Sequence, residues 1–203
     1  MATLNQVCVY CGSGAGEDPA YAESARVLGH ALAKAGIRLV YGGGSVGLMG
    51  IIARSVLDGG GEVTGIIPRF LEKRERVFPD VSDLIVTENM HERKMLMFER
   101  ADAFVALPGG IGTLEEYIEQ LTWVQLGQHQ KPVLLANIAG FWQPLIDLLD
   151  HMRAENFIRN NMDVSPLVSD NADDIVPMLA EACAARPQEA IDLPADVEEI
   201  RRL

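Results

Sequence analysis

An apolar strand followed by a glycine turn and a helix start is the feature that most restricts what this chain can fold into. Residues 103–107 read Ala-Phe-Val-Ala-Leu, an apolar run typical of a parallel strand covered on both faces. Residues 108–112 read Pro-Gly-Gly-Ile-Gly, and a helix is expected to begin at Thr113. Glycines let backbone N–H groups approach a ligand closely, and a helix N-terminus adds unpaired amides and a positive dipole end. The junction therefore predicts an anion site, with phosphate as the anion.

Two side chains of the expected helix belong with this anion site. Thr113 offers a hydroxyl donor, and Glu116 lies one turn later on the same side of the helix. Glu115 points about 160° away from Thr113, at ~100° per residue. Thr113-x-x-Glu116 is alternatively a capping box, which needs no ligand. The preceding glycines favour the ligand-binding interpretation, because an ordinary cap does not need them.

A second glycine-rich junction spans Gly42 to Gly50 and reads Gly-Gly-Gly-Ser-Val-Gly-Leu-Met-Gly. It fits the G-x-G-x-x-G spacing of dinucleotide sites. Such sites also have an acidic residue at the end of the next strand. Here that position, residues 67–69, reads Ile-Pro-Arg and contains no acid. A full dinucleotide is therefore not expected. The alternative is that these glycines only allow close packing of helix against strand.

Expected strands and helices alternate along the whole chain. This order predicts a Rossmann-like, doubly wound parallel sheet of about seven strands, with helices on both faces. We expect one domain over 1–203, with 185–203 as a C-terminal tail of unassigned role. Pro166 lies within the last expected strand, which should therefore be at a sheet edge. The expected strands are 6–10, 37–41, 62–67, 83–87, 103–107, 132–136 and 164–168, and the expected helix caps include Asp18, Asn89 and Asn171.

Ligands of such sheets bind beyond the carboxyl ends of the strands. The segments 11–13, 42–50 and 108–113 all follow expected strands, so they should converge on one rim. A further helix after Asn89 places Lys94 on an apolar stripe with Arg93 beside it. Basic residues at that position suit the border of a cleft, although surface ion pairing is the alternative.

The motif Pro-Gly-Gly-x-Gly-Thr-x-x-Glu at 108–116, with Met-His-Glu-Arg-Lys at 90–94, resembles the Lonely Guy (LOG) family. The resemblance runs from about Val7 to about Ala180. It implies a cytokinin riboside 5′-monophosphate phosphoribohydrolase, a class often mislabelled as lysine decarboxylase. It implies that Arg93 and Glu116 are catalytic. Together with the local patterns it predicts substrate or phosphate contacts at Ser13, Gly43, Gly44, Glu75, Lys94, Gly109, Gly110, Ile111, Gly112, Thr113, Leu114, Glu115 and Thr122.

Two of these contacts have alternatives in the local sequence. Glu75 lies in the charged segment 69–79, which we expect to be a mobile loop over the site or, alternatively, a solvated run of charges. Thr122 is alternatively a helix residue that bonds to its own turn.

Composition restricts the partners and the compartment. A net charge of −12 argues against duplex nucleic acid and anionic membranes, because both need a basic face. No apolar stretch approaches ~18 residues, and the first residues lack a signal-peptide pattern. Three cysteines, an odd number, fit a reducing cytoplasm. Cys8-x-x-Cys11 lacks the second pair of a zinc site, and the four histidines show no ligand spacing, so neither metal nor cofactor is expected.

The function that these patterns favour is hydrolysis of the N-glycosidic bond of a nucleoside 5′-monophosphate. The substrates would be N6-modified adenosine (cytokinin riboside) 5′-monophosphates, AMP or both, and the products free base and ribose 5-phosphate. A nucleotide- or cofactor-binding carrier on the same fold is the alternative. A pyridoxal-phosphate lysine decarboxylase is less favoured, because only Lys94 among the lysines lies in a motif. The resemblance implies a homodimer that acts on a small nucleotide. The motifs contain no residue that indicates which base is recognised.

Overall fold

A computed structural model describes residues 3–72, 76–78, 80–158 and 166–186. The described chain forms a seven-stranded sheet in the order β4-β3-β2-β1-β5-β6-β7, and every strand pair is parallel. The strands are β1 (Gln6–Tyr10), β2 (Arg38–Tyr41), β3 (Val63–Pro68), β4 (Asp83–Thr87), β5 (Ala103–Ala106), β6 (Val133–Ala136) and β7 (Leu167–Ser169). The helices are α1 (Pro19–Lys34), α2 (Gly47–Asp58), α3 (Met90–Glu99), α4 (Ile111–Gln125), η1 (Ile138–Gly140), α5 (Gln143–Ala154) and α6 (Ala172–Ala185). The predicted doubly wound fold is confirmed.

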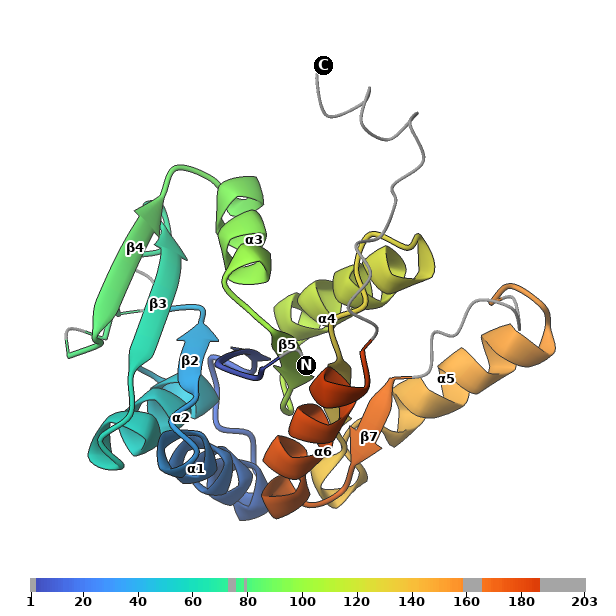
Figure 1. Cartoon of the computed structure of the whole chain (residues 1–203), viewed down its shortest axis with the longest axis horizontal. Helices are drawn as coiled ribbons and strands as arrows, with labels where there is room; N and C mark the ends of the chain where they lie inside the picture. The colour runs from blue at the N-terminus through green and yellow to red at the C-terminus, as the bar shows by residue number, and fades with distance from the viewer. Residues whose placement is uncertain (1–2, 73–75, 79, 159–165, 187–203) are drawn as a thin grey trace.

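Helices cover both faces of the sheet and bury two separate cores (Figure 1). Residues of α1, α2 and α6 pack on one face, with Leu28, Ile52 and Leu179 fully buried. Residues of α3, α4 and α5 pack on the other, with Met97 and Tyr117 almost fully buried. Alternate side chains of each central strand point to opposite faces of the sheet, and both faces are covered by helices. The central strands are therefore continuous hydrophobic runs.

The strand order reverses between β1 and β5. From β1 the chain winds outward through β2, β3 and β4, then returns to the other side of β1 with β5. Pairing continues past the strand ends, because Leu107 N donates to Tyr10 O at 2.9 Å and Gly12 N donates to Pro108 O at 3.1 Å. The loops after β1 and β5 therefore leave the sheet side by side, and such a reversal point is where doubly wound sheets bind ligands.

Helix caps follow the sequence closely. The side chain of Asp18 accepts a hydrogen bond from Ala20 N, that of Asn89 from Glu92 N, and that of Asn171 from Asp173 N. Each satisfies one of the amides that a helix start leaves unpaired, so these predicted caps are confirmed.

The last strand differs from its expected bounds. β7 begins at Leu167, directly after Pro166, because proline has no N–H to donate to a ladder. Its place at the sheet edge, beside β6 alone, is as predicted. Most of the tail 185–203 lies outside the described residues, and α6 ends at Ala185. In the part of the chain that the structure describes, no helix combines the length and apolar character needed to cross a membrane.

Candidate active site

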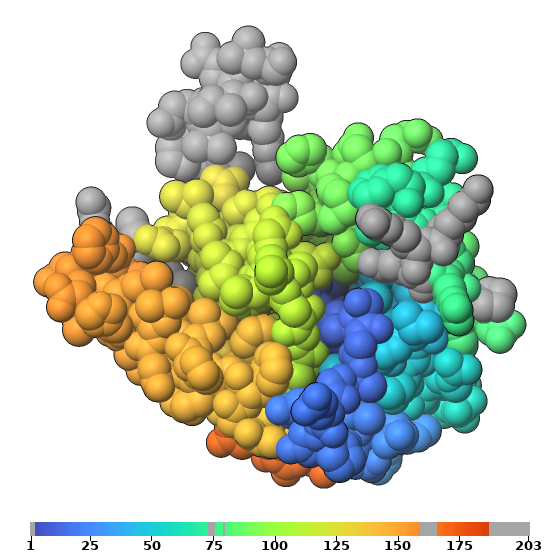
Figure 2. All heavy atoms as spheres, turned by 180° about the vertical axis from the view of Figure 1, so that it is seen from behind, coloured from blue at the N-terminus to red at the C-terminus, as the bar shows by residue number. Residues whose placement is uncertain are grey.

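A cavity of about 240 Å³ opens at the carboxyl ends of β1, β2 and β5. Figure 2 shows the surface hollowed where the blue loop after β1 meets the green and yellow-green segments of α3 and α4. The segments 11–13 and 110–113, together with Gly42, line the cavity, so the predicted convergence of three loops is confirmed. The remaining lining residues are Val9, Tyr10, Met49, Arg93, Met97 and Glu116.

The first turn of α4 presents open amides to this cavity. The helix begins at Ile111, with Gly110 as its N-cap and no side-chain capping bond. The expected start at Thr113 was therefore wrong by two positions, and the capping-box alternative is not found, because Thr113 lies inside the helix. Thr113 and Glu116 are both buried and both line the cavity. The amides of Ile111, Gly112 and Thr113 have no carbonyl one turn earlier in the helix, which leaves them for an anion.

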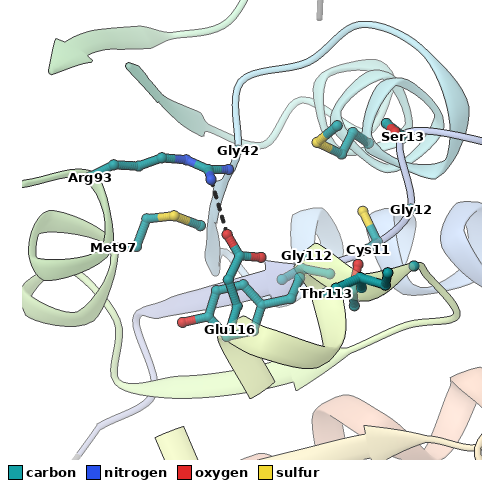
Figure 3. Close-up of a pocket in the computed structure, with 14 residues that line it drawn as sticks. Cys11, Gly12, Ser13, Gly42, Arg93, Met97, Gly112, Thr113 and Glu116 are labelled. Atoms are coloured by element: carbon teal, nitrogen blue, oxygen red, sulfur yellow. Dashed lines mark ion pairs between the residues drawn. The ribbon is translucent and has the colours of Figure 1, made fainter. Parts of the chain in front are cut away.

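A buried ion pair faces these amides across the cavity. Arg93 Nη1 lies 3.0 Å from Glu116 Oε1, and both side chains are only about one-tenth exposed (Figure 3). Arg93 Nε also donates to Ile66 O at 3.1 Å, which anchors the guanidinium to β3. Charges buried this deeply need partners, and each of these has one. The structure thus brings together the two residues that the resemblance marks as catalytic.

The second glycine junction differs from the first in one decisive way. The helix-start amides of α2 are already occupied, since Leu48 N donates to Gly12 O and Gly14 O, and Met49 N donates to Gly12 O. Gly43 O accepts from Phe78 N, and Gly44 pairs with Val77, so both face the segment 76–78. Neither lines the cavity. Their contact with substrate stays a prediction; their observed backbone partners are in the segment 76–78 and not in a packed helix.

Other predicted contacts lie outside the cavity lining. Lys94 Nζ pairs with Glu115 Oε1 at 2.7 Å and with Glu119 Oε1 at 2.8 Å, which joins α3 to α4. Thr122 Oγ1 donates to Ile118 O at 2.8 Å, as its local alternative predicted. Leu114 is half-buried beside the α4 core face, Gly109 lines a neighbouring cavity, and Glu75 falls outside the described residues. Substrate contacts at these positions stay predictions.

The predicted segments 11–13 and 42–50 supply Cys11 and Met49 to the cavity lining, but the sulfur-rich wall that these two form with Met97 was not predicted. Figure 3 shows Met97 and Cys11 of this wall. Met97 lies one turn after Arg93 on α3, so the helical spacing held a signal for it. Met49 had no such signal, because its position depends on how α2 packs against the loop after β1.

Tyr10 lines the cavity, Cys8 lies two residues earlier in β1, and both stay protonated. Burial raises the pKa of the Cys8 thiol and of Tyr10 well above their ordinary values, and the nearby Glu116 charge raises both further. A thiol with a raised pKa is a poor nucleophile. Neither Cys8 nor Cys11 is in a disulfide. These observations give no support to a redox role for the Cys8-x-x-Cys11 pair.

No described lysine lines the cavity, and its Cys11 and Glu116 are not part of a larger cluster of metal-ligand groups among the described residues. Lys34, Lys94 and Lys131 all lie elsewhere, which leaves no described lysine to hold pyridoxal phosphate at this site. Among residues 3–72, 76–78, 80–158 and 166–186, no three His, Cys, Asp or Glu side chains cluster as metal ligands would.

Fold and site together define a doubly wound α/β protein with an uncapped helix start and an acid–arginine pair in one cavity. The family model described as "Possible lysine decarboxylase" matches residues 49–179. A rice (Oryza sativa subsp. japonica) protein, "Probable cytokinin riboside 5′-monophosphate phosphoribohydrolase LOGL1", is 51% identical over 156 residues, covering 77% of this chain and 70% of its own. The Arabidopsis thaliana LOG2 phosphoribohydrolase is 44% identical over 178 residues, covering 88% of this chain and 84% of its own. The chain belongs to this LOG family.

Solved structures with the same fold are more distant in sequence. TM1055 superposes with a TM-score of 0.68 at 24% identity, covering 88% of this chain and 99% of that one. A molybdenum cofactor binding protein from Rippkaea orientalis superposes with a TM-score of 0.65 at 25% identity, covering 88% of this chain and 96% of that one. They show that the arrangement of strands and helices is common to several proteins.

Proposed function

We propose that the protein hydrolyses the N-glycosidic bond of adenosine-type 5′-monophosphates, including N6-modified ones, to free base and ribose 5-phosphate. One observation carries the proposal: a buried Arg93–Glu116 pair and the open first turn of α4 line the same cavity. Relatives that cover most of the chain are named for this reaction on cytokinin riboside 5′-monophosphates. The site residues and their roles below are part of the proposal.

The phosphate is held by the first turn of α4. The amides of Ile111, Gly112 and Thr113 donate to its oxygens, and the positive end of the helix dipole favours its charge. The Thr113 hydroxyl adds a side-chain donor. Binding at the phosphate, remote from the bond that breaks, orients the sugar and lowers the entropic cost of reaching the transition state.

The Glu116 carboxylate lies beside the bond that breaks. As the C1′–N bond breaks, its electron pair leaves with the base and the sugar becomes cation-like, which a nearby carboxylate stabilises. The oxygen of water bonds to C1′ and Glu116 accepts one of its protons. The departing base nitrogen takes up a proton from solvent, and Glu116 afterwards releases its own proton to solvent. Arg93 orients the Glu116 carboxylate through the 3.0 Å ion pair between them. The hydrogen bond from Arg93 Nε to Ile66 O holds the guanidinium in place.

Chromatography of the products tests this reaction. Incubation of the protein with AMP and with isopentenyladenosine monophosphate should release adenine and isopentenyladenine. Glu116→Gln and Arg93→Ala should each lower kcat by about 100-fold or more, the scale of a lost electrostatic or positioning group. The matched controls are Glu99→Gln, at the last residue of α3, and Arg100→Ala, directly after it; both residues are exposed, and both variants should leave kcat unchanged. Unchanged turnover in both site variants would contradict the catalytic roles of Glu116 and Arg93.

The carrier alternative has support from the molybdenum cofactor binding protein of similar fold. A carrier would return AMP intact, whereas a hydrolase releases the base. The Arg93–Glu116 pair supports hydrolysis, because a carrier has no need of a carboxylate aimed across its ligand cavity. A panel that adds GMP and CMP would then define the base preference.

We also propose a cytoplasmic homodimer. The three cysteines of the chain are buried and outside any disulfide, which supports a reducing compartment. Ile111 lines the cavity and is 87% exposed, which supports coverage of the cavity mouth by a second subunit. Light scattering after gel filtration measures the mass; a monomer over the whole micromolar range would contradict the dimer.

A further inference from the structure

A second cavity of about 320 Å³ lies beside the first, on the other side of the glycine turn. The two cavities share Gly12, Ser13 and Gly110, and the second is lined by neither Arg93 nor Glu116. Its volume falls at the lower end of the range of small-molecule sites, about 300–1,000 Å³. Its remaining lining residues are Gly14, Ala15, Gly16, Tyr21, Leu48, Pro108, Gly109 and Phe141.

Two aromatic rings from distant parts of the chain form its wall. Tyr21 lies in the first turn of α1 and Phe141 follows η1, and their ring centroids are 5.4 Å apart at an interplanar angle of 76°. The blue start of α1 lies beside the gold segment that contains η1 (Figure 2). Both side chains are only partly buried, so each keeps surface available to a ligand.

Local backbone conformation places both rings. Gly16 has a φ of +75°, and any Cβ there would collide with the Tyr21 ring, so the glycine lets the ring fold against the loop. Ala139, with a φ of +52°, and Gly140, with a φ of +71°, turn the chain just before Phe141. A left-handed alanine is uncommon, and such conformations recur at ligand sites.

The lining selects the chemistry of a ligand. Among the described residues no charged side chain lines the second cavity, so an ionic group would lose its hydration there without a partner. An edge-to-face pair of rings favours contact with another flat ring. Main-chain amides and carbonyls of the glycine-rich loops, with the Ser13 hydroxyl, offer donors and acceptors to the edge of such a ring.

We propose that this second cavity binds a flat, neutral heteroaromatic ring of the size of a purine base. The choice of a purine rests on the proposed function, whereas the preference for a neutral ring rests only on the lining. A ring bound here lies across Gly110 from Glu116, with the anion-binding turn between them. It is therefore outside the cavity that holds the catalytic pair.

The ring has two sources: the free base, bound as a separate molecule, or the base of an intact nucleotide. Calorimetry with adenine as the probe separates ring binding from catalysis. Adenine is titrated into protein saturated with ribose 5-phosphate, and its Kd is compared between wild type, Tyr21→Leu and Phe141→Ala. We expect each variant to raise the Kd about 5- to 10-fold, the scale of one lost aromatic contact.

Two controls keep the result specific. Tyr21→Phe retains the ring and should bind adenine within twofold of wild type. Phe157→Ala removes an 81% exposed ring beyond the opposite end of α5 and should not change the Kd. Circular dichroism at the assay temperature confirms that each variant is folded.

Kinetics with AMP then identifies the source. If KM is unchanged in Tyr21→Leu and Phe141→Ala while adenine binding weakens, the ligand is the free base. If KM rises in parallel with the adenine Kd, the cavity holds the base of the nucleotide. An adenine Kd unchanged in both variants would overturn the proposal. Absence of AMP hydrolysis by wild type would instead contradict the proposed function, and the calorimetric result would stand by itself.

Discussion

The guanidinium of Arg93 occupies the space in which a side chain on Gly42 would begin. Gly42 follows β2 and Arg93 lies on α3, so two segments far apart in the chain share this small volume. Met49 Sδ also lies only 3.2 Å from the position of that missing Cβ. The glycine after β2 therefore makes room for the arginine that contacts Glu116, and does not itself need to touch a ligand.

Gly42→Ala is expected to displace the Arg93 guanidinium while the fold is retained. The new methyl group meets the flexible end of a long side chain, which can move away more easily than backbone. Because the guanidinium would no longer aim Glu116, kcat with AMP should fall about 100-fold, the scale of a misplacement near 1 Å. Steady-state kinetics and thermal melting measure the two effects.

Gly36→Ala is the matched control for this substitution. Gly36 follows α1 with a φ of +68° and has nothing within 4 Å of an added Cβ. The variant should lose about 1 kcal/mol of unfolding free energy from its left-handed conformation and keep full turnover. Equal kcat in Gly42→Ala and Gly36→Ala would contradict the link between Gly42 and Arg93.

Thr113→Val should weaken nucleotide binding without unfolding the protein. Valine has nearly the shape of threonine, so the buried position stays filled, but the hydroxyl donor to the phosphate is lost. A hydrogen bond to a charged group contributes about 1.5–3 kcal/mol, so KM for AMP should rise about 10- to 100-fold. Thr113→Ser keeps the hydroxyl and should stay within a few-fold of wild type; a similar rise in KM in both variants would contradict this role.

Lys94 should act on the site through the packing of α3 against α4. Lys94→Met removes the partner of Glu115 and Glu119, and Glu119 Oε2 is already buried without a hydrogen-bond partner among the described residues. We expect a loss of about 1–2 kcal/mol of unfolding free energy, because a partly buried charge loses its counter-ion. The kcat with AMP should fall together with the stability. Urea denaturation and AMP kinetics measure the two.

The double variant Lys94→Met/Glu119→Met distinguishes packing from substrate contact. Removing both charges leaves no unpaired carboxylate at position 119, so stability and kcat should both recover toward wild type. Recovery of stability with turnover still lost would show that Lys94 contacts the substrate directly, as the family resemblance implies.

His129 should make the fold less stable in mild acid. Burial, with the nearby Lys131 charge, lowers the pKa of His129 from 6.5 to about 4. As pH falls below 6.5 the unfolded chain takes up a proton at this residue, whereas the folded chain does not until about pH 4. The folded state therefore loses stability between these values, by about 2 kcal/mol between pH 7.5 and pH 5.

His129→Asn tests this pH dependence. His129 Nδ1 accepts from Lys131 N at 3.0 Å, and the asparagine side-chain oxygen can take over that acceptor without titrating. Urea unfolding at the two pH values gives the difference for each protein, and the other titrating groups cancel between them. The difference should be about 2 kcal/mol smaller in the variant; equal differences would show that His129 does not contribute.

Periodicity and turn residues were enough to predict the elements of this fold. Asp18, Asn89 and Asn171 cap helices as expected, because a cap depends on residues within one turn of each other. The start of α4 was missed by two positions, since a glycine N-cap leaves no side-chain signal. Strand bounds differ from the prediction by at most one residue except at the start of β7, which lies three residues later, after Pro166. A strand boundary depends on which neighbouring carbonyl or amide is in reach.

The residue pattern predicts the alternation of strands and helices and the two glycine junctions at strand ends, and the family motif adds the candidate pair Arg93 and Glu116. Which junction keeps its amides open depends on how distant segments pack. The carbonyls of Gly12 and Gly14, from another loop, occupy the start of α2 and leave that of α4 to a ligand. Packing also decided that Lys94 faces Glu119 and that Tyr21 meets Phe141. Spacing along a chain sets local backbone geometry, whereas contacts between distant segments exist only once packing has brought them together.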